Sequence, residues 1–181
     1  MAIALVILSI LAWLSAIALL FRDRTFAPVA AYFGLFMLSL ATVENGEPLL
    51  PLNGTILTGW LCITLAVMTA SFLQSAEIRN DNAGMGYMTA GAITGMAVGL
   101  LGYNTTADIS ILYAIMIIAT LTGTFFGYLI FSRTPQGRSY GIRSSKFTSY
   151  LLAKGFPTAI TVMIAGVALV LVIAVKNSNT L

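Results

Sequence analysis

The sequence GMGYMTAGAITGMAVGLLGY, residues 84–103, carries glycines at four-residue spacing within an otherwise apolar run. On a helix with 100° per residue, Gly91, Gly95 and Gly99 fall on one face and Met96 falls on the other. In water an interior glycine costs about 1 kcal/mol relative to alanine. In a lipid bilayer, by contrast, small residues let two helix backbones approach closely. The pattern therefore predicts a membrane-spanning helix that packs through its glycine face.

The next apolar run carries a similar series of small residues. Residues 104–108, NTTAD, are typical of a short turn, which would make the two helices antiparallel neighbours. We predict that the pair packs as a glycine zipper formed by Gly91, Gly95, Gly99, Ala119, Gly123 and Gly127. In the alternative interpretation, the glycine face meets a second protomer or lines a path for a solute.

The composition is that of a membrane protein. Hydrophobic residues make up 59% of the chain, charged residues 8%, and the mean hydropathy is +0.95, whereas a soluble domain carries about 25% charged residues. The apolar runs lack the alternation of a membrane barrel, so helices are expected. We predict one all-α domain, 1–181, a bundle of about six transmembrane helices at 2–21, 26–43, 55–74, 85–103, 109–131 and 156–175.

The charges predict an orientation for this bundle. If the six runs cross the membrane alternately, eight of the nine lysines and arginines fall on one side. The other side then receives Glu44, Glu47 and Asp108. An excess of basic residues marks the cytoplasmic side. We therefore expect both termini to lie outside the cytoplasm and the protein to reside in the plasma (inner) membrane of a bacterium.

Residues 132–155 form the only long polar segment, and this segment contains five cations and no acid. Residues 139–153 intersperse apolar with basic side chains, which predicts a short helix lying on the membrane surface. The cations would contact anionic lipid head groups, at about 1 kcal/mol each, or dock a cytoplasmic partner or a phosphate-bearing substrate. They are Arg133, Arg138, Arg143, Lys146 and Lys154. No nucleic acid is expected as a partner.

Several site chemistries are excluded by composition. The chain has no histidine and one cysteine, which excludes haem with histidine ligation, histidine-based zinc sites and Ser-His catalysis. The acidic residues all map to loops or span ends, so no proton relay is expected within the bilayer. We predict no catalytic residue, no metal and no cofactor. Glu44 and Glu47 are candidates for an outer-loop contact with a cation or a partner, or they form a solvated turn.

Threonines supply the hydroxyl groups of the later spans. In lipid, such hydroxyls usually bond to a backbone carbonyl one turn earlier or across a helix interface. Alternatively, they would line a narrow polar path. The residues concerned are Thr89, Thr94, Thr120, Thr122, Thr124, Thr158 and Thr161.

Three functional classes follow from these features. The first is a non-enzymatic membrane protein, either an accessory subunit of a complex or a small channel or carrier, with other membrane subunits or a second copy as partners. The second is a binding module for lipid or a small apolar ligand, and the least expected third is a membrane enzyme. A subunit predicts an apolar groove that a partner helix fills, a transporter predicts a continuous polar path, and an enzyme predicts polar residues converging near one membrane face.

Overall fold

The computed structural model describes residues 2–22, 24–42, 49, 52–101 and 109–178. Within these ranges the chain is all-helical and contains no strand. In chain order the elements are α1 (Ala2–Arg22), α2 (Ala27–Ser39), α3 (Gly54–Phe72), α4 (Ala76–Asn80), α5 (Met85–Leu101), α6 (Ile109–Ser132), the 3₁₀ turn η2 (Arg138–Tyr140), α7 (Phe147–Tyr150), the π-helical turn η3 (Leu151–Gly155) and α8 (Phe156–Ser178).

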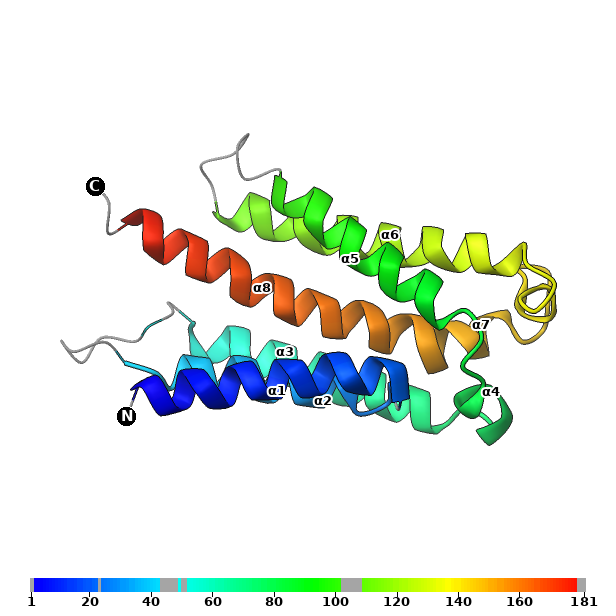
Figure 1. The fold of residues 1–181 in the computed structure, drawn as a ribbon, viewed down its shortest axis with the longest axis horizontal. Helices are drawn as coiled ribbons and strands as arrows, with labels where there is room; N and C mark the ends of the chain where they lie inside the picture. Colours follow the sequence, from blue (N-terminus) through cyan, green and yellow to red (C-terminus); the bar gives the residue numbers. More distant parts are fainter. Residues whose placement is uncertain (1, 23, 43–48, 50–51, 102–108, 179–181) are drawn as a thin grey trace.

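The long helices are arranged around α8. Figure 1 shows α8 running through the middle of the bundle, with α1, α2 and α3 on one side and α5 and α6 on the other. The turns α7 and η3 continue into α8, so that one helix runs over Phe147–Leu171. It is the most enclosed of the long apolar helices, and 83% of its most apolar 18-residue stretch is buried. Its side chains Met163, Ile164, Val167 and Leu171 form one buried cluster with Leu35 and Leu38 of α2 and Met116 of α6.

Among the described residues, four helical segments are long and apolar enough to cross a membrane: Ile3–Arg22, Gly54–Phe72, Ile111–Ser132 and Phe147–Leu171. These helices indicate a membrane protein and fit a membrane bundle. The two other apolar helices are shorter. With 13 residues, α2 rises only about 20 Å, less than the ~30 Å hydrocarbon core, and α5 has 17 described residues. The predicted run 26–43 is therefore longer than the helix that forms there.

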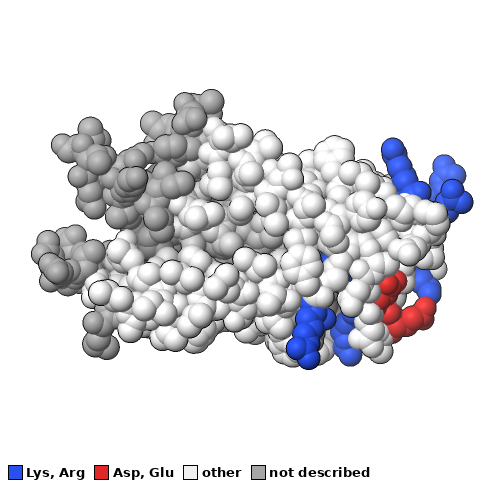
Figure 2. All heavy atoms as spheres, in the orientation of Figure 1, with Lys and Arg blue, Asp and Glu red and all other residues white. Residues whose placement is uncertain are grey.

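The helices alternate in direction, and this alternation brings the charges together. In Figure 1, α1, α3 and α6 run towards one end of the bundle, and α2, α5 and α8 return from it. On the face drawn in Figure 2, the coloured lysines, arginines and acidic residues gather at that end, which we call the basic end. The charged turns that the structure describes thus lie at one pole, with an apolar body behind them.

Pro157 and Ser71 explain why the helix contains a π-helical turn where η3 meets α8. Pro157 has no N–H, so the carbonyl oxygen of Ala153 lacks its usual α-helical donor. The Ser71 hydroxyl on α3 donates to that oxygen over 3.2 Å. The helix runs through the site as a π-helical turn rather than breaking. The same bond ties α3 to the central helix.

Local signals also set two helix starts. The Asn53 side chain accepts hydrogen bonds from the backbone N–H groups of Thr55, over 2.6 Å, and Ile56, over 3.3 Å, which caps α3. Gly84 precedes α5 with φ +74°, a conformation that other residues rarely adopt. A Cβ at Gly84 would also lie 2.6 Å from the Phe131 ring, so this turn requires glycine.

The surface helix expected over 139–153 does not form. Residues 138–146 fold as a 3₁₀ turn and tight turns, and the last helix begins at Phe147, nine residues before the expected start of the last span. The reason is an aromatic cluster that takes in Tyr140 and Tyr150 and so ties this segment to the bundle. Its buried members are Ile78, Met88, Tyr128, Phe131, Tyr140, Tyr150 and Ala153.

Candidate functional site

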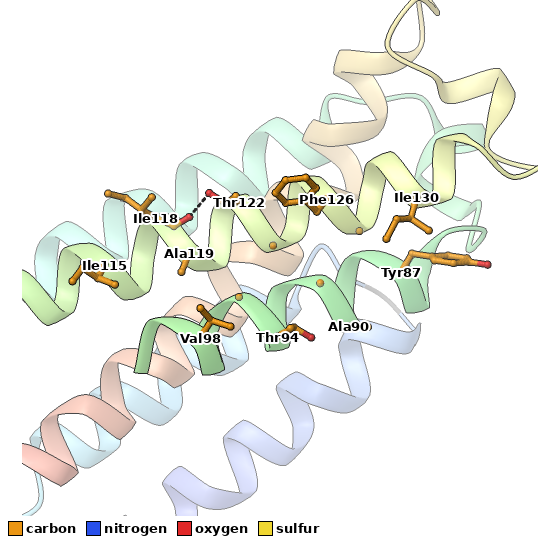
Figure 3. A pocket seen from close by; sticks show the side chains of 14 residues that line it. Tyr87, Ala90, Thr94, Val98, Ile115, Ile118, Ala119, Thr122, Phe126 and Ile130 are labelled. Atoms are coloured by element: carbon orange, nitrogen blue, oxygen red, sulfur yellow. Dashed lines mark hydrogen bonds between the residues drawn. The ribbon is translucent and has the colours of Figure 1, made fainter. Parts of the chain in front are cut away.

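An apolar groove lies between α5 and α6 on the outer surface of the bundle (Figure 3). Its volume is about 700 Å³, within the range typical of ligand pockets. Four large side chains on its walls are more than half exposed: Val98 (58%), Ile118 (63%), Phe126 (60%) and Ile130 (56%). The remaining lining residues are Tyr87, Ala90, Gly91, Thr94, Gly95, Ile115, Ala119, Thr122, Gly123 and Gly127.

The floor of the groove is backbone. A Cβ added to Gly91 would overlap the carbonyl oxygen of Gly123, and one added to Gly127 would overlap that of Tyr87. A Cβ on Gly95 would lie 2.9 Å from the carbonyl carbon of Ala119. The six small residues singled out in the sequence therefore lie together, between α5 and α6: Gly91, Gly95, Gly99, Ala119, Gly123 and Gly127.

The threonine prediction is confirmed for five residues. Their hydroxyls donate to the carbonyl four residues earlier, over 2.7–2.8 Å, at Thr120, Thr122, Thr124, Thr158 and Thr161. Thr89 differs, because its buried hydroxyl has no hydrogen-bond partner among the described residues. Thr94 lines the groove and is exposed. Most of these hydroxyls are thus committed to their own helices.

Four of the five cations predicted to meet lipid or a partner have accessible side chains at the basic end. Arg133, Arg138 and Arg143 are exposed. The Lys146 ammonium lies 3.0 Å from a Glu77 carboxylate oxygen, and both side chains are well exposed, at 44% and 73%. An exposed pair of this kind contributes at most about 1 kcal/mol. These side chains are therefore accessible to solvent at the basic end.

Lys154, the fifth cation, is only 4% exposed. Its ammonium donates to the backbone carbonyl of Arg79, which closes the join between α4 and η3. The position does not suit the predicted surface contact. The physical reason is that the helix begins early, at Phe147, and carries Lys154 inside with the aromatic cluster.

Three tyrosine hydroxyls make hydrogen bonds that hold the polar segment 132–155 against the bundle. Tyr140 donates to Asp81 over 2.6 Å, Tyr128 donates to the carbonyl of Tyr140, and Tyr150 donates to the carbonyl of Ala83. Burial, reinforced by the hydrogen bond to Asp81, raises the pKa of Tyr140 to about 12. Tyr140 therefore remains a donor at physiological pH. The residues serve to hold the structure together, and sequence reasoning missed them.

The second missed feature is a polar cavity at the basic end, with a volume of about 400 Å³. It is lined by Arg22, Thr25, Phe72, Arg79, Asn80 and Asn82. Arg24, between two of the lining residues in sequence, is 2% exposed. Its Nε donates to the carbonyl of Leu20 over 2.9 Å, and burial lowers the pKa of Arg24 to about 10. The sequence of the charged turn at residues 22–24 does not indicate that one of its arginines is buried.

The structure describes only some of the other predicted site residues. Glu44 and Glu47 lie outside the described residues. Among the residues that are described, no group of three or more histidine, cysteine, aspartate or glutamate side chains is placed to hold a metal. The described residues therefore form two candidate sites. One is the apolar groove between α5 and α6, whose floor is backbone, and the other is the cationic cavity at the basic end.

Comparison with known proteins adds no assignment to this chain. No family model matches it, and neither a curated protein nor a solved structure matches it.

Proposed function

We propose that this protein is a non-enzymatic accessory subunit of a membrane complex, and that its α5–α6 groove receives a transmembrane helix of a partner subunit. The observation that carries the proposal is the groove itself, apolar, open at the outer surface and floored by glycine backbone. In this proposal α5 and α6 form a glycine zipper within a bundle of six membrane spans.

A helix is the occupant that this floor suits best. Helices associate in lipid through close backbone approach and dispersion contacts, because lipid offers no hydrophobic driving force between them. The glycine floor lets a third backbone come near the first two. Thr94 on α5 presents a hydroxyl to the groove, a group that frequently hydrogen-bonds across helix interfaces. The exposed walls, such as Ile118 and Phe126, would flank the incoming helix.

The orientation follows the charge distribution. The basic end would face the cytoplasm, with both termini on the other side, in the plasma membrane of a bacterium. The exposed cations Arg133, Arg138 and Arg143 would then lie at the level of anionic lipid head groups. The short helices α2 and α5 would lie against longer ones, α2 against α1 and α8 and α5 against α6 and α8.

A channel or carrier is supported less well. The hydroxyls that would have to line its path bond back to their own helices at Thr120, Thr124 and Thr158. The side chains around α8 are predominantly apolar. The second candidate is a module that binds a lipid chain, which is favoured by the apolar lining and by Arg133, three residues beyond Ile130 at the end of the groove.

The experiment is site-specific crosslinking in native membranes. A photoreactive amino acid replaces Thr94 in the groove, and crosslinked products are identified by mass spectrometry. We expect one membrane protein in fixed ratio, whose crosslink is lost when Ala90→Leu fills the groove. The matched control is Ala66→Leu, a substitution of an exposed alanine on α3 away from the groove, which should leave the crosslink intact. Crosslinks to lipid alone would contradict the subunit proposal and favour the second candidate.

A further inference from the structure

The polar cavity at the basic end lies where α1, α3 and α4 end. Arg22 is the last residue of α1, Phe72 is the last of α3, and Asn80 closes α4. Both α1 and α3 are among the candidate membrane spans. The cavity therefore lies at the level where a span leaves the apolar layer and phosphate groups of lipids are found.

The lining is rich in hydrogen-bond donors. Two guanidinium groups, two carboxamides and one hydroxyl surround the space, and the described lining contains no carboxylate. The Arg79 guanidinium lies 5.5 Å from the centre of the Phe72 ring and donates from Nη1 to the carbonyl of Phe72 over 3.4 Å. These contacts orient the planar side chain, and guanidinium groups suit paired hydrogen bonds to phosphate oxygens.

A third guanidinium adds an independent observation. Arg24 is 2% exposed, and its Nη1 and Nη2 atoms have no hydrogen-bond partner among the described residues. A buried cation without a compensating anion is costly, because its hydration is lost and nothing replaces it. Its neighbour Asp23 lies outside the described residues. Arg24 precedes the lining residue Thr25 in the chain, so three guanidinium groups belong to the segments that form this cavity, which favours an anionic ligand.

We infer that this cavity is a binding site for a phosphate group, carried either by an anionic phospholipid or by a soluble phosphate. Arg22 and Arg79 bind the phosphate oxygens, the side chains of Asn80 and Asn82 add neutral donors, and Arg24, next to Thr25 in the chain, adds a third positive charge. The site is separate from the α5–α6 groove and does not depend on the proposed subunit role.

The test measures thermal unfolding of the full chain with two probes. One is inorganic phosphate added to protein in a neutral detergent, with sodium chloride at equal ionic strength as reference. The other is incorporation into phosphatidylcholine nanodiscs with or without phosphatidylglycerol. A ligand that binds only the folded state raises the unfolding temperature with its concentration. A rise with phosphate identifies a soluble ligand, and a rise only with phosphatidylglycerol identifies the lipid head group. No rise with either overturns the inference.

Variants then locate the effect. Arg22→Gln and Arg79→Gln should each weaken the apparent affinity for the effective probe about tenfold, the loss expected for a hydrogen bond to a charged group. The control is Arg143→Gln, which removes the same charge from an exposed position at the same end, and it should change affinity less than twofold. Equal losses in the cavity and control variants would mean general surface attraction and would overturn the site.

The variant Arg24→Met tests the inference through the stability of the ligand-free protein. Without a counter-ion among the described residues, the buried guanidinium destabilises the ligand-free protein, so its removal should leave that form at least as stable as the wild type. The temperature rise caused by the effective probe should shrink. A less stable ligand-free variant with an unchanged response to the probe would show that the chain itself satisfies Arg24, and the inference would fail.

Discussion

The hairpins α1–α2 and α5–α6 both use glycine at a helix–helix contact, but in different ways. In α1–α2, a Cβ on Gly34 would meet the Trp13 side chain, 2.6 Å from Cδ1. In α5–α6, a Cβ on Gly123 would meet backbone, 2.9 Å from the Cα of Gly95. A side chain can rotate away from an added methyl group, whereas a packed helix backbone must shift as a whole. Gly34 therefore lies at a contact that can adapt to an added side chain, whereas Gly123 lies at a rigid contact.

The two hairpins also differ in their polar contacts. The Ser9 hydroxyl donates to the carbonyl of Gly34 over 2.8 Å, and Trp13 Nε1 donates to the carbonyl of Ala31 over 3.3 Å. Both bonds cross from α1 to α2. In α5–α6 the contacting glycines contribute only backbone atoms. The first hairpin is thus held partly by side-chain hydrogen bonds, and the second depends on how closely its backbones approach.

The largest expected effect comes from Gly95→Leu. A branched side chain at this position collides with the backbone of Ala119 and Thr120, so we expect a loss of more than about 3 kcal/mol, at the upper end of overpacking costs, or failure to fold. Thermal unfolding and size-exclusion chromatography in detergent measure it. Met96→Leu, one residue away and nearly equal in volume, should cost less than about 1.5 kcal/mol. If both variants express and melt alike, the glycine face is not a packing face.

Gly34→Ala should have an intermediate effect. Trp13 must move to admit the methyl group, and we expect a loss of about 1–3 kcal/mol with a change in tryptophan fluorescence, since Trp13 is one of two tryptophans in the chain. Equilibrium unfolding and emission spectra provide the two readouts. An unchanged spectrum together with a loss as large as that of Gly95→Ala would remove the distinction between the hairpins.

The smallest effect is expected for Ser9→Ala. Hydrogen bonds between helices within membranes contribute about 0.6 kcal/mol on average and about 1.7 at most, so the loss should fall in that range. Ser15→Ala is the control, because the exposed Ser15 hydroxyl donates to the carbonyl of Leu11 in its own helix. Unfolding of both variants under identical conditions gives the comparison. Equal losses would mean that the Ser9 bond contributes nothing specific to the α1–α2 contact.

The sequence predicted those features that depend on local pattern. Long apolar runs predicted the helices, because backbone groups in lipid must bond within one segment. The hydroxyls of Thr120 and Thr158 bond back as expected, because their acceptor lies one turn away whatever the tertiary fold. The four-residue spacing of small residues identified positions that lie together between α5 and α6, since the spacing selects one helix face.

Features that depend on tertiary contacts could not be predicted in the same way. The last helix begins at Phe147 because distant aromatic residues such as Tyr128 and Phe131 bury its first turn. Lys154 and Arg24 look like ordinary interfacial cations in the sequence, yet both are buried by elements far along the chain. The α5–α6 groove and the cationic cavity are likewise spaces between elements, which no hydropathy profile records.

The central claim, backbone contact between α5 and α6, is tested most directly by measuring the unfolding free energies of Gly95→Ala and Gly59→Ala side by side. Around Gly59, in α3, nothing lies within 4 Å of an added Cβ, so alanine should stabilise the helix by up to about 1 kcal/mol. At Gly95 the same methyl group meets backbone, and alanine should destabilise the protein. Opposite signs are the predicted result, and stabilisation by both substitutions would contradict the claim.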